Sequence, residues 1–275
     1  MRVEMHCHST ASDGADSPAD VGRQAASGGL ALFCLTDHDT CAGCGEAASA
    51  FGSGGTTLRG VEVSAVDNGR TVHLLVYDAA RGSGWAALGD RLIDQASARR
   101  ARMRDMLARL AARGVPLAFA DVEAEAAGAV MGRPHLARAL VRAGHVSSVG
   151  EAFDRWLGDG GSADVPLARF LVADALALAR AAGARVSLAH PHTYGPVRAA
   201  DLLRRYRDAG LEGLEAWYGS YGPREREDWL AMARDFGAVV TAGSDYHGVP
   251  EVVPAMGVDL PEPYAARLLA WLGVA

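Results

Sequence analysis

The chain has 275 residues, of which 49% are hydrophobic and 22% are charged, and its formal net charge is −6. These values are typical of a globular protein with one large α/β domain, or a domain with a sizeable insertion. The acidic balance argues against long nucleic acid as a partner, and no apolar run approaches a membrane span. Because the chain opens with a strand pattern and has no signal peptide, we expect a cytoplasmic protein.

Short apolar segments alternate with amphipathic segments in the first 83 residues. Four strands are predicted, at residues 2–6, 31–36, 58–64 and 71–77. The last two are close enough in sequence to form a hairpin-like return. Helices are predicted at residues 18–27 and 40–51. Alternation of this kind indicates βα units and a parallel sheet or barrel.

The pattern changes between residues 84 and 164, where leucine and methionine recur at helical spacing with few strand signals. The sequence therefore predicts a mainly helical insertion between two parts of a barrel, residues 1–83 and 165–275. The methionines of this segment are expected in its core. Its neighbouring arginines are expected on a solvated helix face: Arg99, Arg100, Arg102 and Arg104.

Strands and helices alternate again after Pro166. Helices are predicted at residues 167–182, 199–209, 224–236 and 263–272. Strands are predicted at residues 185–189, 214–217 and 238–241. Clusters of polar residues follow the carboxyl ends of the predicted strands, which is where α/β barrels gather their active sites.

Most of the nine histidines stand in short clusters that also hold an acidic residue. His6 and His8 are two positions apart on an extended segment, so both side chains should point to one face while Cys7 points away. Asp245 and His247 repeat this spacing. Imidazole and carboxylate are ligands of hydrolytic divalent metals, so the clusters predict a multinuclear metal centre.

Several polar residues near these clusters have other interpretations. Asp13 stands in a Ser-Asp-Gly turn and could cap a helix instead of binding metal. Asp37 and Asp39 are expected to support histidine ligands rather than to be ligands themselves. His145 is expected at the surface.

The absence of lysine limits the chemistry, since all 27 basic residues are arginine. It excludes Schiff-base chemistry, a P-loop lysine and a carbamylated lysine that bridges metals, so any bridging ligand must be a carboxylate. Two or three divalent ions a few ångström apart suit phosphoester hydrolysis. The pattern Cys41-Ala-Gly-Cys44 has redox or zinc-knuckle spacing, but without a second such pair we interpret the four cysteines as free thiols in a reducing compartment.

A set of strings, in this order along the chain, resembles those of the PHP (polymerase and histidinol phosphatase) family. They are His6-Cys7-His8-Ser9 with Ser12-Asp13-Gly14, Leu35-Thr36-Asp37-His38-Asp39-Thr40, Gly60-Val61-Glu62-Val63-Ser64, Val72-His73-Leu74-Leu75, Gly132-Arg133-Pro134-His135, Ala189-His190-Pro191 and Gly243-Ser244-Asp245-Tyr246-His247. The resemblance covers essentially the whole chain, and the GRPH string in the helical insertion resembles the YciV/TrpH-like branch. It implies a distorted (β/α)7 barrel with a helical insertion and a trinuclear metal site.

The resemblance also implies which residues bind the metals, with Glu62 as the bridging carboxylate. The ligands of the first ion would be His6, His8, Glu62 and Asp245. Those of the second would be Asp13, His38 and His247. Those of the third would be Glu62, His73 and His135. Two to three manganese, iron or zinc ions would be the cofactors.

Three residues are candidates for contact with substrate. Arg133 is expected to grip a phosphate, because a guanidinium matches two phosphoryl oxygens; the alternative is a surface ion pair. His190 could orient phosphate or protonate the leaving oxygen, or it could be a structural strand-end histidine. His192 stands where the branch usually has a nearby arginine, so it could alter specificity.

The branch is similar to enzymes that remove phosphate from 3′,5′-bisphosphonucleotides and trim short RNA from its 5′ end. The resemblance implies the same class of reaction here, in which a metal-bridging hydroxide attacks phosphorus in line. Asp164 replaces an aromatic residue that could stack on a base, so a phosphatase for another small phosphomonoester, for example in a biosynthetic pathway, is the alternative enzyme. A catalytically silent PHP module that serves as a binding domain is the alternative of another class.

Overall fold

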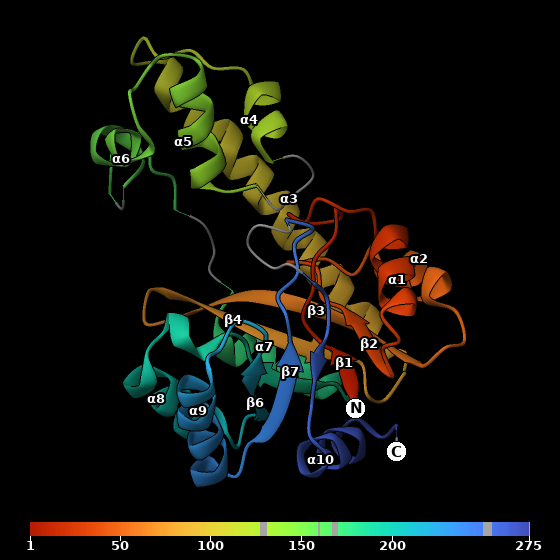
Figure 1. Cartoon of the computed structure of the whole chain (residues 1–275). Coiled ribbons are helices and arrows are strands. Elements are labelled where there is room, and N and C mark those ends of the chain that lie inside the picture. Colours follow the sequence, from red (N-terminus) through yellow and green to blue (C-terminus); the bar gives the residue numbers. More distant parts are fainter. Residues whose placement is uncertain (127–130, 159, 167–169, 250–254, 275) are drawn as a thin grey trace. The chain divides into compact units, whose positions relative to one another are not determined.

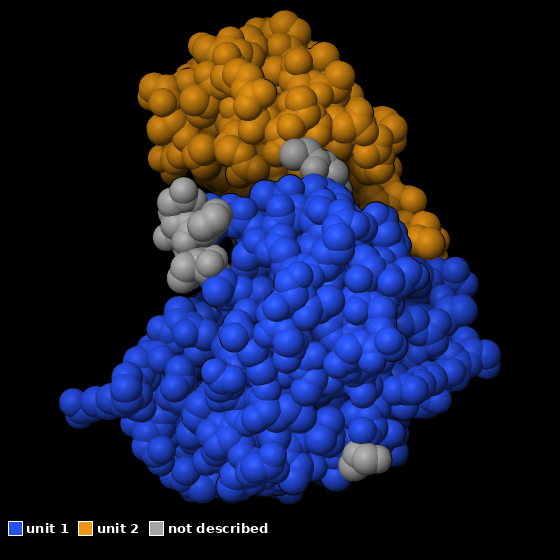
Figure 2. Space-filling model, turned by 45° about the vertical axis from the view of Figure 1, so that its right-hand side comes forward, with its two compact units in different colours: residues 1–90, 170–275 blue, residues 91–169 orange. Residues whose placement is uncertain are grey.

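The computed structural model describes residues 1–126, 131–158, 160–166, 170–249 and 255–274. The chain divides into two compact units, residues 1–90 with 170–275 and residues 91–169 (Figure 2). The boundary falls within helix α3 (Gly84–Ala111), which begins in the first unit and ends in the second. No helix in the described ranges is long and apolar enough to cross a membrane.

The first unit is built on an eight-stranded sheet with helices around it (Figure 1). Its strands are β1 (Arg2–Glu4), β2 (Leu32–Leu35), β3 (Thr56–Asp67), β4 (Arg70–Tyr77), β5 (Arg185–Leu188), β6 (Leu211–Tyr218), β7 (Val239–Gly243) and β8 (Val258–Asp259). In space they follow the order β7-β6-β5-β4-β3-β2-β1-β8. The amide of Met5, just after β1, donates to the carbonyl of Ala242 in β7 at 3.1 Å, so the sheet is nearly closed. The predicted distorted α/β barrel is confirmed.

The sheet is mixed rather than fully parallel. Pairing is parallel for β1–β2, β2–β3, β5–β6 and β6–β7, and antiparallel for β3–β4, β4–β5 and β1–β8. The predicted hairpin is therefore confirmed, and its two-residue turn is Asn68-Gly69. These residues have φ values of 47° and 80°, the left-handed values that a tight hairpin turn requires.

Most predicted helices of the first unit are present with small shifts at their ends. They are α1 (Pro18–Ser27), α2 (Cys44–Phe51), α7 (Val172–Ala181), α8 (Pro196–Tyr206), α9 (Pro223–Phe236) and α10 (Glu262–Leu272). The bounds of α1 agree with the prediction, because Ser17 caps the helix by accepting a hydrogen bond from the amide of Asp20.

Two helices begin later than the sequence predicts. Residues 41–44 form a turn before α2, in which the amide of Cys44 donates to the carbonyl of Cys41 at 3.3 Å. The first three residues of the predicted helix at 167–182 lie outside the described residues, and α7 begins at Val172. Strand β8 was not predicted, because two residues are too few to show a period.

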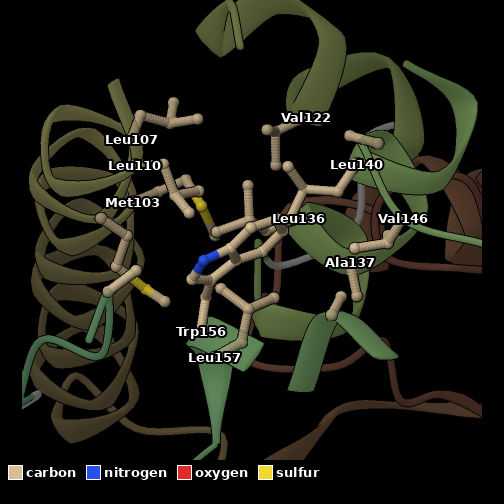
Figure 3. Close-up of a cluster of buried hydrophobic side chains, with 14 of the residues drawn as sticks. Met103, Leu107, Leu110, Val122, Leu136, Ala137, Leu140, Val146, Trp156 and Leu157 are labelled. Carbon is tan, nitrogen blue, oxygen red and sulfur yellow. The ribbon is translucent and has the colours of Figure 1, made fainter. Parts of the chain in front are cut away.

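The second unit is helical within its described residues. Its further helices are α4 (Phe119–Ala126), α5 (Arg133–Arg142), α6 (Val149–Ala152) and the short π-helix Phe153–Leu157. Buried side chains from these helices and α3 form one apolar cluster, which includes Met103, Met106, Leu136 and Trp156 (Figure 3). The expected core position of the methionines is confirmed.

One of the four neighbouring arginines of α3 differs from the expected solvated position. Arg102 is largely buried and forms an ion pair with Asp164 at 2.8 Å. The carboxylate of Asp164 also accepts a hydrogen bond from the amide of Gly160. Asp164 therefore has a structural role at the position where the family resemblance led us to consider a base-stacking residue.

Candidate metal centre

The first group of predicted ligands forms where β1 and β7 end. The amide of His8 donates to the carbonyl of Tyr246 and that of Asp245 to the carbonyl of His6, each at 2.8 Å, so the two loops are held side by side. The Nε2 atoms of His6 and His8 lie 3.3 and 3.2 Å from Asp245 Oδ1. The same two atoms lie 3.3 and 3.2 Å from Glu62 Oε2. Both histidines point to one face, as their spacing predicts.

A second group surrounds Asp13, which is the most exposed member of the centre. Its Oδ1 atom lies 3.5 Å from His8 Nδ1 and 3.4 Å from His247 Nε2, and its Oδ2 lies 3.7 Å from His38 Nε2. Asp13 does not cap a helix, since Ser17 caps α1. One atom from each of these four residues lies within 4.8 Å of the others, a spacing that suits a metal ion.

A third group forms around the other oxygen of Glu62. Oε1 of Glu62 lies 2.9 Å from His73 Nδ1 and 3.0 Å from His190 Nε2. His38 Nδ1 approaches Oε2 of the same carboxylate at 3.0 Å. Glu62 is fully buried and contacts histidines from every group. His190 thus lies among the candidate ligands rather than apart from them.

The expectation that every cluster follows the end of a strand is wrong for two residues. Glu62 lies inside β3 and His73 lies inside β4. Since β4 runs antiparallel to its neighbours, its amino-terminal half lies at the edge of the barrel where the parallel strands end. The reversed strand therefore brings His73 to the same edge as the other ligands.

Four buried atoms at this centre have no hydrogen-bond partner within the described residues. They are His6 Nε2, His8 Nε2, His38 Nδ1 and Glu62 Oε2. Burying polar atoms without partners is costly, and native structures show few of them. Nitrogen and oxygen atoms that converge at 3.0–3.3 Å without hydrogen-bond geometry fit ligands arranged around a divalent cation.

The electrostatics of the centre also favour a bound cation. Burial opposes ionisation of Glu62, but His38, His6 and His73 lower the pKa of this carboxyl well below its usual value. Burial likewise opposes protonation of His8, but contacts with Asp245 and Glu62 raise its pKa to about 9. The buried carboxylates thus favour positive charge at the centre. A bound metal ion would supply that charge in place of the protons on the imidazoles.

Glu215 is a supporting residue that the sequence analysis missed. It is fully buried in β6, and its Oε1 lies 2.9 Å from His6 Nδ1. Its Oε2 accepts a hydrogen bond from the amide of His190 at 2.7 Å, where the backbone has the unusual φ of 26°. A carboxylate on the second ring nitrogen orients a metal-binding histidine and fixes its tautomer. The available signal was that Glu215 lies between apolar residues of the strand 211–218, which also holds the exposed Glu212.

Glu4 is a second buried carboxylate that the sequence analysis missed. Its oxygens accept hydrogen bonds from the amides of His6 at 3.0 Å, Ser244 at 2.9 Å and Gly257 at 2.8 Å. Burial raises the pKa of Glu4 to about 6. Glu4 therefore joins the loops after β1 and β7, from which ligands of the first group extend.

Asp37 supports the centre indirectly, while Asp39 holds the backbone. The carboxylate of Asp37 accepts hydrogen bonds from the amide of Ser9 and the hydroxyl of Ser12, each at 2.7 Å. The Ser12 hydroxyl lies 3.4 Å from His8 Nδ1, so Asp37 reaches this histidine through Ser12. Asp39 accepts a hydrogen bond from the amide of Ser64 at 2.7 Å.

Two predicted site residues, Arg133 and His135, lie in the second unit at the start of α5. Arg133 donates to the carbonyl of Leu157 at 3.0 Å. Nδ1 of His135 accepts a hydrogen bond from the amide of Gly132 at 2.9 Å. With that lone pair engaged, the neutral ring carries its proton on Nε2, so metal binding by His135 requires this cap to open.

His192 lies beside the first unit's ligands with its ring held in place. Its Nδ1 and the hydroxyl of Tyr221 are 2.9 Å apart. Next to it, the hydroxyl of Tyr218 donates to Asp245 Oδ2 at 2.8 Å. His145, by contrast, lies in the second unit, where its Nε2 is 3.0 Å from the carbonyl of Pro116.

Comparison with known proteins places this arrangement in a family. The chain is 34% identical over 251 residues to a 5′-3′ exoribonuclease of Haemophilus influenzae, which covers 90% of both chains. It is 32% identical over 253 residues to a 3′,5′-nucleoside bisphosphate phosphatase of Chromobacterium violaceum, covering 90% of this chain and 88% of the relative. A putative metal-dependent phosphoesterase from Bifidobacterium adolescentis has the same fold, with a TM-score of 0.71, 29% identity, and coverage of 98% of this chain and 96% of that one. Residues 4–157 match the PHP domain, and the chain belongs to the PHP family.

Proposed function

We propose that this protein is a metal-dependent phosphoesterase that hydrolyses phosphomonoesters of nucleotide type. The observation that carries the proposal is the convergence of three imidazole nitrogens and one carboxylate oxygen, all buried and without hydrogen-bond partners within the described residues. Relatives named as a bisphosphate phosphatase and an exoribonuclease support a substrate that is a 3′,5′-bisphosphonucleotide or a short RNA.

The proposed ligands are the residues of the three groups other than His190, with Glu62 shared between the groups. Eight of the nine residues that the family resemblance implies belong to the first unit and lie in the candidate groups. His135 is retained as a proposed ligand on the Gly132–His135 string alone. Two or three manganese, iron or zinc ions are proposed, since the donors are imidazole and carboxylate.

Divalent ions bound here would act as Lewis acids toward a phosphoryl oxygen and lower the pKa of a coordinated water. The protein holds the ligands in position through Glu215, Glu4 and Asp37, which are buried. We propose that His190, at the rim of the third group, orients the phosphate or protonates the leaving oxygen. Arg133 is proposed as a phosphate contact and His192 as a substrate contact.

A substrate panel tests the proposal. Initial rates would be measured with manganese on adenosine 3′,5′-bisphosphate, a short 5′-phosphorylated RNA and a set of sugar phosphates. We expect the highest kcat/KM on one of the two nucleotide substrates. The variant Glu62→Gln is the matched control, because it removes charge from the shared carboxylate and keeps its volume.

Other results would support one of the two alternative functions or contradict the metal centre. Highest kcat/KM on a sugar phosphate would favour the small-molecule phosphatase. No turnover of any phosphoester by protein that holds its metals would favour the silent binding module. Fewer than two bound transition metals per chain in elemental analysis would contradict the multinuclear centre.

A further inference from the structure

The pair Cys41 and Cys44 is a motif that phosphoester hydrolysis leaves unused. We propose that these two cysteines form a reversible disulfide by exchange with a low-molecular-weight disulfide such as glutathione disulfide, and that this bond disturbs the metal centre. The first part stands independently of the enzyme's activity. The second part rests on the proposed function.

The local geometry suits a disulfide. Residues 41–44 form a turn closed by the hydrogen bond from the amide of Cys44 to the carbonyl of Cys41. Such a turn holds its first and last Cα atoms within about 7 Å, and disulfides join Cα atoms about 4.4–6.8 Å apart. The two thiols shift each other's pKa, which is raised for Cys41 and lowered for Cys44.

The four free cysteines differ in access to reagents. Cys41 is half-buried, and Cys44 behind it is 7% exposed. Cys7 and Cys34 are fully buried, and the Cys7 thiol donates to the carbonyl of Cys34. A reagent in solution therefore reaches the pair through Cys41, while the other two thiols serve as internal controls.

The reaction is a two-step thiol–disulfide exchange. One thiolate of the pair attacks a sulfur of the small disulfide, breaks its S–S bond and releases one small thiol. The second thiolate of the pair then attacks the mixed disulfide and releases the other small thiol. The protein loses two electrons and two protons, and both small thiols leave in reduced form.

A disulfide here would remove a contact that supports β3. The Cys44 thiol donates a hydrogen bond to the carbonyl of Gly60 at 3.2 Å. Gly60 lies two positions before Glu62 on the same strand. Because a disulfide sulfur has no hydrogen to donate, oxidation leaves the carbonyl of Gly60 without its thiol donor.

The turn also packs against the carboxylate that supports His8. A Cβ atom built on Gly43, between the two cysteines, would lie 3.0 Å from Asp37 Oδ2. Asp37 in turn holds Ser12, whose hydroxyl lies next to His8. Since packing at Gly43 is this close, a change in the turn on disulfide closure is transmitted to Asp37 and from there to a candidate ligand.

The disulfide itself is tested by mass. Metal-loaded protein would be incubated with glutathione disulfide, blocked with an alkylating reagent and analysed intact and as peptides. We expect a loss of two hydrogen atoms per chain, mapped to Cys41 and Cys44, with Cys7 and Cys34 left as thiols. Cys41→Ser and Cys41→Ala should not form the bond. Four unmodified thiols, or a stable glutathione adduct alone, would overturn the proposal.

The effect on the metal centre is tested by rate. Turnover of adenosine 3′,5′-bisphosphate should fall severalfold on oxidation, recover with dithiothreitol and stay unchanged in Cys41→Ser under the same treatment. Disulfide formation with an unaltered rate would refute the coupling to the metal centre. A reduced, metal-loaded protein that turns over neither adenosine 3′,5′-bisphosphate nor the short RNA would instead refute the proposed function, and the mass measurement would still decide whether the pair oxidises.

Discussion

Glu62 is the residue on which the centre depends, because it is buried and lies within 3.3 Å of five histidines. Those contacts are with His6, His8, His38, His73 and His190. The family resemblance implies this residue as the bridging carboxylate, and the absence of lysine agrees with that role. A single side chain therefore couples the three groups of ligands.

Replacing Glu62 with Gln should reduce turnover at least about a hundredfold while the fold is retained. Loss of a supporting residue at a metal site costs about 10–100-fold, and a shared ligand should cost no less. Activity, bound metal and circular dichroism would be measured together. The exposed Glu46→Gln is the control, and an active Glu62→Gln variant would contradict the bridging role.

Glu215→Gln should lower metal affinity or turnover by about 10–100-fold, because the amide is a weaker orienting partner for His6 than a carboxylate. Metal titration and the thermal midpoint of the metal-free protein separate positioning from stability. A fall in the midpoint without a loss of metal affinity would show that Glu215 is only structural.

The sequence marked the polar residues that the structure brings together, but it did not mark the residues that support them. Each ligand type is recognisable in a short string such as His6-Cys7-His8, where spacing alone sets the direction of the side chains. Glu4 and Glu215 have apolar residues on both sides, and each also bonds a residue far along the chain, Ser244 for Glu4 and His6 for Glu215. Since only the closed barrel makes these long-range contacts, no local pattern reveals the two supports.

At the scale of elements, β3 and α8 are joined by one buried carboxylate. Asp67, the last residue of β3, accepts two hydrogen bonds from the Arg205 guanidinium, each at 2.8 Å, and one from the Tyr206 hydroxyl at 2.8 Å. The hydrogen bonds from Arg205 lower the pKa of Asp67. Burial raises this pKa, and the hydrogen bond from Tyr206 lowers it further. The ion pair thus fixes the end of the hairpin to a helix.

Asp67→Asn should reduce the free energy of unfolding by about 1.5–3 kcal/mol at neutral pH, the range for hydrogen bonds to charged groups. Since the pKa of Asp67 is lowered in the folded state, its contribution is present above the unfolded value of 3.8 and is lost as pH falls through the folded value. Urea unfolding of metal-free protein at pH 7 and pH 3 would show the difference between variant and parent shrink. A difference that stays constant with pH would contradict the ion-pair explanation.

Element bounds were predicted well where a capping residue marks them, as Ser17 does for α1. The start of α2 was predicted too early, because the turn at residues 41–44 has no proline and contains residues that a helix also tolerates. The sequence predicted only one of the antiparallel pairings that make the sheet mixed. The hairpin was predicted, but antiparallel pairing of β4 with β5 spans the whole second unit and leaves no local trace.

At the scale of the molecule, each unit has its own apolar core. The first unit contains a cluster that includes Phe33 and Phe51, whose rings stack at 5.3 Å. The second has the cluster of α3 to the π-helix, in which Leu136 is fully buried. The insertion was predicted from its change of period, although α3 runs on through the boundary between the units.

Leu136→Ala should destabilise the second unit by about 2–5 kcal/mol, because truncation of a fully buried leucine leaves a cavity. Native-state hydrogen exchange should show faster exchange in residues 91–169 and unchanged exchange in the sheet. Val149→Ala is the control, since this side chain is 40% exposed in the same unit. Equal loss of protection in both units would show that their cores unfold together.

The reversed strand β4 has a consequence for how the protein folds. Glu62 and His73 belong to one hairpin with a two-residue turn, and hairpins form in about 1–10 μs. The pairing of His6 with Asp245 spans almost the whole chain and pays the larger entropy of closing a long loop. Two of the candidate ligands are therefore brought together early, but the complete set of ligands exists only after the barrel closes. Tight metal binding should therefore appear with the last step of folding and not with the first.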